Sequence, residues 1–252
     1  MTQVDANEKA NGALKMTSIM ETLCSSGRPL SVREVEESAA IPRSTAHRLL
    51  LSLESCGWAF RDPLTNGYRP GIRFLLLSSR SSLYDALIRT AEPEMTDLMR
   101  STGNTVTLSV REGCLGFCIF TVEPATPVKF TARRGLSVPL HAGATGKILL
   151  AYAPEEIRSR VLSSPLPSPL GGDDADPVRL REDLERIRAQ GYAVSREEWM
   201  SHAGDISVPL FDGRGIFVAQ LGVAGIAESI FGGFDETLRR LLNAAQTIRN
   251  KL

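Results

Sequence analysis

Ile41-Pro42-Arg43-Ser44-Thr45-Ala46-His47-Arg48-Leu49-Leu50 is the stretch that decides the fold of the first third of this chain. Leu49, Leu50 and Leu53 form an apolar stripe at helical spacing. The short polar and basic residues ahead of that stripe can enter a DNA major groove and bond to phosphates and base edges. The candidate contacts are Arg43, Ser44, Thr45, His47 and Arg48. A basic, solvated helix surface is the alternative for this stretch taken alone.

The residues just upstream predict a second helix. Ser31 can cap its start, and Glu34 three residues later completes a capping box. Pro42 opens the next helix after the short Ala40-Ile41 turn. Two helices joined by so few residues predict a helix-turn-helix.

The residues just downstream predict a β-hairpin. Gly57 ends the second helix in a left-handed conformation. Residues 58–61 and 68–70 read as paired strands, and residues 62–67 carry the turn residues between them. This hairpin is a wing, and the wing residues expected to touch the DNA backbone or minor groove are Arg61, Asn66 and Arg69.

Composition limits the class of protein. The 252 residues carry 29 Lys+Arg against 29 Asp+Glu, so any DNA binding must come from the local placement of arginines. Four cysteines make no disulfide framework in a chain of this size. No apolar run is long enough to span a bilayer, and the polar N-terminus is no signal peptide. We therefore expect a cytoplasmic protein with no membrane partner.

Periodicity divides the chain into four parts. We expect a disordered tail over residues 1–11, a winged helix-turn-helix over 12–71, a linker helix over 72–82 and a larger domain over 83–252. A free linker is expected to be polar, but this one contains Ile72, Phe74, Leu75 and Leu76. We therefore expect these apolar residues to pack against a partner chain. An ordinary core helix is the alternative.

The larger domain mixes strand pairs with helices. One long helix over 83–102 contains Pro93, which predicts a kink or a break. Strands are expected at residues 105–110, 115–120, 128–132, 193–195, 206–211 and 217–224, and Asp235 is expected to cap a last helix. The fold class is therefore α+β, with an antiparallel sheet flanked by helices.

Residues 30–77 resemble the winged helix-turn-helix of the IclR family of bacterial transcription regulators. The resemblance continues over nearly the whole chain after about residue 12. It rests on Pro42-Arg43-Ser44-Thr45, His47-Arg48-Leu49-Leu50, Gly57-Trp58, Gly67-Tyr68-Arg69, Pro139-Leu140-His141-Ala142, Gly146-Lys147, Gly191-Tyr192-Ala193 and Pro209-Leu210-Phe211-Asp212. It implies a GAF-like effector-binding domain, a homodimer that can pair into a tetramer, and double-stranded operator DNA as partner. No cofactor is implied.

The resemblance also implies an effector pocket. It places Ser195, Asp205, Gly222 and Ala224 at effector-contact positions. The backbone amides of Ala144, Thr145 and Gly146, at a helix start, are expected to hold a ligand carboxylate. A plain tight turn is the alternative there. Leu115, Phe117 and Phe130 are candidate apolar walls, and Gly222 and Ala224 should leave one wall roomy. Asp205 should accept from a hydroxyl or amine of the ligand; a cap of the turn after Ala203-Gly204 and an exposed position at the strand start are the alternatives for Asp205. The expected effector is a small organic acid, hydroxylated and aromatic or ring-containing.

Other chemistries fit less well. Residues 141–148 depart from the phosphate-loop pattern, because His141 replaces its first glycine and Ile148 follows Lys147. Cys114 and Cys118 lie roughly 13 Å apart on a straight strand, too far for one zinc ion. The sequence contains neither a Gly-x-Ser-x-Gly nor a His-Glu-x-x-His pattern, although Arg196-Glu197-Glu198 could offer carboxylates for acid–base work. A metabolic enzyme and a sensor acting through protein contacts remain the alternatives to a DNA-binding regulator.

Overall fold

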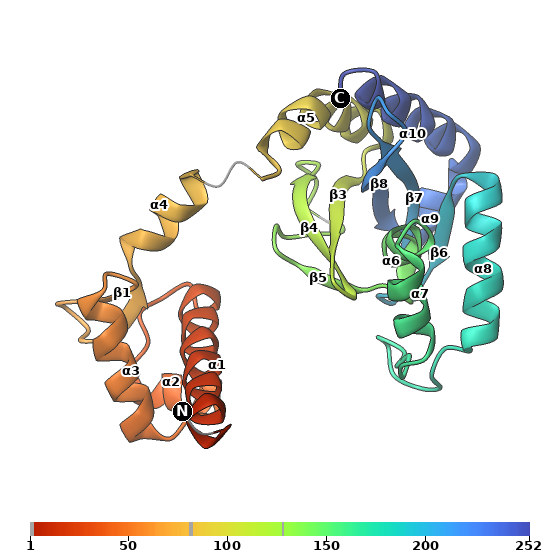
Figure 1. The fold of residues 1–252 in the computed structure, drawn as a ribbon. Helices are drawn as coiled ribbons and strands as arrows, with labels where there is room; N and C mark the ends of the chain where they lie inside the picture. The colour runs from red at the N-terminus through yellow and green to blue at the C-terminus, as the bar shows by residue number, and fades with distance from the viewer. Residues whose placement is uncertain (1–2, 81–82, 128) are drawn as a thin grey trace. The chain divides into compact units, whose positions relative to one another are not determined.

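The computed structural model describes residues 3–80, 83–127 and 129–252, and the chain forms two compact units, Met1–Ser82 and Leu83–Leu252 (Figure 1). The first unit begins with three helices, α1 (Gln3–Ser25), α2 (Val32–Ala39) and α3 (Arg43–Ser55). The expected disordered tail over residues 1–11 is therefore wrong from residue 3 onward, because α1 continues back to Gln3. Residues 1–2 lie outside the described residues.

The turn between α2 and α3 follows the local sequence signals. The Ser31 side chain accepts from the Glu34 backbone N–H, and the Glu34 carboxylate accepts from the Ser31 N–H, which confirms the capping box. Ala40 takes the left-handed conformation that ends α2, with φ of 51°. Pro42 caps α3 instead of occupying its first turn.

The hairpin that follows α3 is formed by β1 (Ala59–Arg61) and β2 (Tyr68–Pro70). Gly57 has the positive φ expected of it, 75°. Tyr68 is buried and exchanges two backbone hydrogen bonds with Leu30, so the hairpin is tied to the segment before α2. The wing therefore has a fixed position against the three helices.

The linker helix α4 (Ile72–Arg80) leaves most of its apolar residues exposed. Ile72 and Leu77 are 62% and 52% exposed. Phe74 differs from expectation, because its ring packs edge-on against Trp58 with centroids 5.1 Å apart. It therefore belongs to the winged unit's own packing. Residues 81–82 of the predicted linker lie outside the described residues.

The second unit is built on a six-stranded antiparallel sheet in the order β5-β4-β3-β8-β7-β6. The strands are β3 (Thr105–Glu112), β4 (Leu115–Val122), β5 (Ser137–Pro139), β6 (Ala193–Arg196), β7 (Ala203–Phe211) and β8 (Phe217–Ile226). The helices are α5 (Asp85–Thr102), α6 (Gly143–Ala151), α7 (Glu155–Leu162), α8 (Pro177–Gln190), α9 (Ala227–Gly232) and α10 (Phe234–Arg249).

Three details of this unit differ from expectation. The strand expected at 128–132 is absent over residues 129–132, which are irregular, and position 128 lies outside the described residues. The edge strand comes later, at β5. Helix α5 continues through Pro93, and α10 begins at Phe234, so Asp235 lies in its first turn rather than at its cap.

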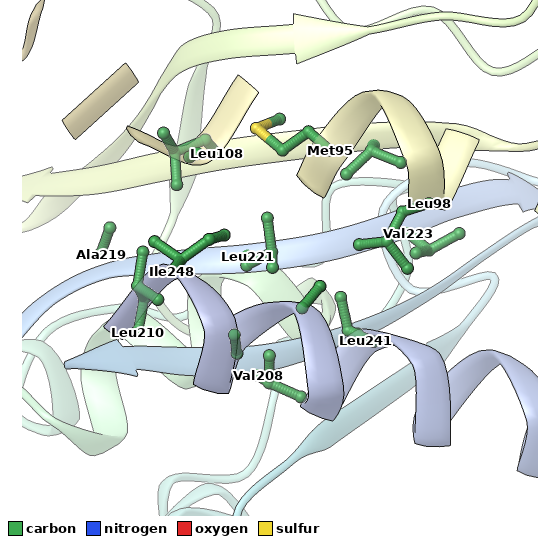
Figure 2. Close-up of a cluster of buried hydrophobic side chains, with 14 of the residues drawn as sticks. Met95, Leu98, Leu108, Val208, Leu210, Ala219, Leu221, Val223, Leu241 and Ile248 are labelled. Carbon is green, nitrogen blue, oxygen red and sulfur yellow. The ribbon is translucent and has the colours of Figure 1, made fainter. Parts of the chain in front are cut away.

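One face of the sheet carries the apolar core. Residues that alternate along β3, β7 and β8 pack against α5 and α10, as Figure 2 shows around Met95, Leu221 and Leu241. Because side chains alternate between the two faces of a strand, the residues in between must face the other way. That second face carries Thr107, Ser109, Ser195, Ser207 and Gln220, all of them buried.

The polar face is covered by α6, which also packs against α8. Leu140, Ile148, Leu149, Leu180 and Leu184 form a separate apolar cluster between those helices. The first turn of α6 thus lies over the polar face of β6 and β7. This arrangement positions the pocket described below.

Candidate functional site

The exposed side of α3 carries the predicted polar and basic residues. Ala46, Leu49, Leu50 and Leu53 are buried, which fixes the opposite side of the helix toward solvent. Arg43, Ser44, His47 and Arg48 are exposed, and Thr45 is half-buried. Leu51, which was not among the predicted contacts, is 45% exposed, one turn beyond His47 and two turns beyond Ser44. It could have been found from helical periodicity, since it falls on the polar side of the stripe.

The three predicted wing residues are all exposed. The guanidinium of Arg69 lies over the ring of Phe60, 4.3 Å from its centroid, and that of Arg61 lies 5.9 Å from the Tyr68 ring centroid. Asn66 has φ of 56° and therefore also serves the turn. Asp62 holds that turn by accepting from the backbone N–H groups of Leu64 and Thr65.

A cavity lies between the polar face of the sheet and the start of α6. Its empty space is about 620 Å³, a figure that includes the part open to solvent. The lining residues are Thr107, Ser109, Cys118, Phe130, Ala132, Leu136, Val138, Ala142, Gly143, Thr145, Ser195, Trp199, Met200, Ala203, Gly204, Asp205 and Ala224. Among them are five of the ten predicted effector residues: Phe130, Thr145, Ser195, Asp205 and Ala224.

Leu115 and Phe117 do not line this cavity. They lie on β4 one residue out of phase with Gly116 and Cys118. A Cβ on Gly116 would stand 2.6 Å from Leu149 of α6, so Gly116 and Cys118 occupy the pocket side of the strand. A shift of one residue moves a side chain to the opposite face of a sheet, which is why both predicted walls are wrong.

Gly222 does not widen the cavity either. A Cβ on Gly222 would lie 2.3 Å from the Gln220 amide nitrogen and 2.7 Å from the Ser207 hydroxyl. That nitrogen donates to Ser207 at 2.8 Å, and Ser207 lies 3.4 Å from the Thr145 hydroxyl. A buried polar network, rather than ligand space, occupies this wall. Its signal in the sequence is the polar pair Asp205 and Ser207 at alternate positions of β7, together with Gln220 in the otherwise apolar β8.

The backbone amides at the start of α6 already hold a carboxylate of the chain itself. The Thr145 N–H donates to Asp205 Oδ2 at 3.1 Å, and the Ala144 N–H donates to Asp205 Oδ1 at 3.4 Å. The expectation that these amides hold a ligand carboxylate is thus corrected, because Asp205 occupies them. Neither Ala144 nor Gly146 lines the cavity.

Asp205 is in an environment that disfavours its charge. Burial raises the pKa of its carboxyl from 3.8 to about 6, against the opposing effect of the Thr145 and Ala144 amides. The carboxylate of Glu198 nearby raises that pKa further, and the Ser195 hydroxyl lowers it. At neutral pH the Asp205 carboxyl is therefore largely ionised, and its buried charge lowers the stability of the folded protein.

A second carboxylate completes the capping of α6. Glu198 Oε2 accepts from the Gly143 N–H at 3.3 Å and lies 2.8 Å from the Lys147 ammonium. Lys147 also pairs with Asp183 of α8 at 3.2 Å and is 12% exposed. Glu198, a candidate for acid–base work in the sequence, is thus part of a structural ion-pair network. His141, at the end of this segment, lies 2.9 Å from the Pro167 carbonyl through its Nε2.

The cysteine at the cavity wall is a buried thiol. Burial raises the pKa of Cys118 to about 11, so thiolate is scarce at neutral pH. Within the described residues, no group of three or more His, Cys, Asp or Glu side chains is arranged to hold a metal ion. In the same part of the chain, no helix is both long and apolar enough to cross a membrane.

Replacing Asp205 by asparagine should remove a pH dependence of stability. Because the folded-state pKa of Asp205 lies above its ordinary value, its contribution to stability is full below about pH 4 and is lost as pH rises through 6. Asp205→Asn should therefore match the wild type at pH 4.5 and be more stable at pH 8, by about 1–2 kcal/mol after allowance for partial solvent contact. Urea unfolding at the two pH values measures this difference.

Asp212 provides a control of opposite sign. The Ile216 and Arg214 amides lower the pKa of Asp212, so its contribution to stability is present above about pH 4 and is lost only at lower pH; Asp212→Asn should therefore destabilise the protein by nearly the same amount at pH 4.5 and pH 8. A stability difference between Asp205→Asn and wild type that does not change with pH would contradict the assignment of Asp205.

The two units together define a class of protein. A winged helix-turn-helix and a ligand-pocket domain in one chain are the architecture of transcription regulators that bind both DNA and a small molecule. The family models agree. The IclR helix-turn-helix domain matches residues 13–63, and the bacterial transcriptional regulator IclR C-terminal domain matches residues 84–250. The chain belongs to the IclR family of bacterial transcriptional regulators. It is a ligand-responsive DNA-binding regulator and not an enzyme.

Named relatives and solved structures support the assignment. The chain is 31% identical to the DNA-binding transcriptional repressor YiaJ of Escherichia coli over 232 residues, covering 90% of this chain and 81% of YiaJ. It is 28% identical to the repressor AllR of the same organism, covering 87% and 82%. An IclR homolog of Microbacterium hydrocarbonoxydans complexed with 4-hydroxybenzoate superposes with a TM-score of 0.82 at 27% identity, covering 95% of this chain and 98% of that one.

Proposed function

We propose that this regulator reads its operator through the exposed side of α3 and the wing, and that a small molecule in the cavity of the second unit changes its affinity for that operator. Arg43, Ser44, Thr45, His47 and Arg48 would contact the major groove. Arg61, Asn66 and Arg69 would contact the flanking backbone or the minor groove. A cytoplasmic location, where the DNA is, forms part of this proposal.

The observation that carries the DNA-binding part is the division of α3 into two sides. Its apolar side is buried against α1, α2 and the wing, while its basic and polar side stays in solvent. Arg69 and Arg61 add positive charge on the adjacent hairpin. The net charge of the chain is zero, so this local grouping supplies the attraction to phosphates.

The test is a gel shift on the DNA upstream of the protein's own gene at several salt concentrations. A specific regulator should bind this DNA more tightly than random DNA of equal length, and the affinity should fall steeply with salt. Equal, salt-independent affinity for both would favour a sensor that acts through protein contacts. No binding to either DNA would reject the proposal.

The proposed effector is a small hydroxylated compound with an aromatic or other ring. Support comes from the cavity, where Phe130, Trp199 and Met200 give apolar lining beside the hydroxyls of Ser109 and Ser195. The related Microbacterium protein was solved with 4-hydroxybenzoate, which has a hydroxylated aromatic ring. A thermal-shift screen of aromatic and aliphatic compounds tests this proposal, since a ligand of the folded state raises its melting temperature.

We further propose a homodimer that uses α4 and can pair into a tetramer. Leu77→Glu should weaken both self-association and operator binding while the second unit stays folded, because Leu77 is 52% exposed on a helix of largely apolar residues. Light scattering and gel shifts measure the two effects. Phe74 is unsuitable for this test because it packs on Trp58.

Val178→Glu is the matched control for the α4 variant. Val178 is 63% exposed at the start of α8, in the other unit, so the same charge placed there should leave assembly and DNA binding unchanged. If Leu77→Glu still forms the oligomer and binds the operator normally, α4 is not part of the interface.

A further inference from the structure

The charge of the cavity is unusual for a site meant to receive an acid. Among the cavity-lining residues named above, Asp205 is the only one with a carboxylate, and none is Lys, Arg or His. The other polar groups at the wall are neutral hydroxyls, from Thr107, Ser109, Thr145 and Ser195. A bound carboxylate would find no cation to pair with.

The second feature is that the natural anion seat is filled. A carboxylate binds well at a helix start because free amides point outward there. In this chain the first three amides of α6 donate to internal carboxylates: Gly143 to Glu198, and Ala144 and Thr145 to Asp205. An anionic ligand would therefore have to displace Asp205 or lie beside two carboxylates.

The third feature is that Asp205 keeps acceptor capacity toward the cavity. A carboxylate has about four lone-pair sites, of which the α6 amides use two and the Ser195 hydroxyl a third. Lys147, in the same helix as those amides, is paired instead with Glu198 and Asp183. Among the described residues, no Lys or Arg forms an ion pair with Asp205, so a ligand in the cavity can supply the cation that the carboxylate lacks.

We propose that the effector meets Asp205 with a hydrogen-bond donor, an ammonium group above all, and that it is not recognised as a carboxylate at this wall. This inference rests on the proposed function, because it names the ligand class of the same cavity. It replaces the expectation of an organic acid with that of an amine or a neutral donor attached to a ring. Ser195 pairs with Asp205 across β6 and β7 and also lines the cavity, so its hydroxyl can form a second hydrogen bond to the ligand.

Three probes of nearly equal shape test the proposal: benzylamine, benzyl alcohol and benzoate, each titrated by calorimetry at pH 7.5 into the full-length protein. The wild type should bind benzylamine at least about tenfold more tightly than benzoate, with benzyl alcohol in between. In Asp205→Ala the order should reverse, because the amides of Ala144 and Thr145 become free to receive the benzoate carboxylate.

Asp205→Asn separates charge from geometry. The amide oxygen of asparagine can still accept from α6, so the preference for benzylamine should fall to nearly equal binding without a gain for benzoate. This arm decides the question if Asp205→Ala does not fold. Asp174→Ala removes the same charge from an exposed loop and should keep the wild-type order of probes.

Tighter binding of benzoate than of benzylamine by the wild type would overturn the proposal, and so would an unchanged preference in both Asp205 variants. Absence of binding by all three probes would also overturn it. The gel shift on operator DNA distinguishes this failure from failure of the proposed function, since the regulator would still bind DNA specifically.

Discussion

Replacing both Arg43 and Arg48 by alanine should weaken binding to operator and to random DNA alike, by about 10- to 100-fold at moderate salt. Both guanidinium groups are exposed at the start and on the outer side of α3. If each neutralises one phosphate, the slope of log affinity against log salt should flatten by about two units, one for each lost contact. Fluorescence anisotropy over a salt series measures the affinity and the slope together.

Base reading should respond differently. His47 is exposed in the middle of the same side of α3, and Thr45 is half-buried beside it. Thr45→Ala and His47→Ala should therefore reduce the ratio of operator to random affinity, by roughly 1–3 kcal/mol for a good base contact, with little change in salt slope. The two kinds of variant separate phosphate contacts from base contacts.

Arg179→Ala is the control for simple loss of charge. Arg179 has a side chain 86% exposed on α8, in the other unit, and its removal lowers the net charge by one, as the loss of either Arg43 or Arg48 alone does. It should leave the salt slope unchanged. A slope that flattens equally in Arg179→Ala and Arg48→Ala would show that long-range charge, not contact by α3, causes the effect.

The winged unit could be predicted in detail because its signals are local. The Ser31–Glu34 capping box lies within four residues, and the hairpin turn within six. Helical periodicity alone separates buried Leu49, Leu50 and Leu53 from the exposed side. Each of these features depends on neighbours in the sequence, so one sequence is enough to place them.

The pocket could be predicted only in part because its geometry depends on distant residues. The β3–β4 pairing shifts between Leu108 and Ser109, and no pattern in β4 reveals which face the shift leaves toward α6. The bond from Thr145 to Asp205 joins residues 60 apart in sequence. The family resemblance correctly placed Asp205 at the cavity, but it could not show that the carboxylate occupies the amides of α6.

Gly146 presents the same contrast between local rule and distant contact. It lies inside α6, where local rules say that alanine would stabilise the helix by about 1 kcal/mol relative to glycine. A Cβ at this position, however, would stand 2.2 Å from the Pro139 carbonyl oxygen and 3.3 Å from Leu140 backbone atoms. Backbone atoms cannot rotate away as a flexible side chain can, so α6 itself must move.

Gly146→Ala should therefore destabilise the second unit, by about 3 kcal/mol, although the residue does not line the cavity. Movement of α6 would also pull the Ala144 and Thr145 amides away from Asp205, whose hydrogen bonds to them are already 3.4 and 3.1 Å long. The variant should lose ligand response even where it remains folded. Its DNA-binding unit has its own core and should keep affinity for operator half-sites.

The two tryptophans allow the units to be followed separately, since Trp58 lies in the first unit and Trp199 lines the cavity in the second. In a Trp58→Phe background, fluorescence during urea unfolding reports on Trp199, and Gly146→Ala should lower its midpoint. Gly12→Ala is the control, because Gly12 lies within α1 with open space around its Cβ position. It should leave the Trp199 transition unchanged and slightly stabilise the first unit, as helix propensity requires. Equal or higher stability of Gly146→Ala would mean that α6 does not lie as close to Pro139 as its contact implies.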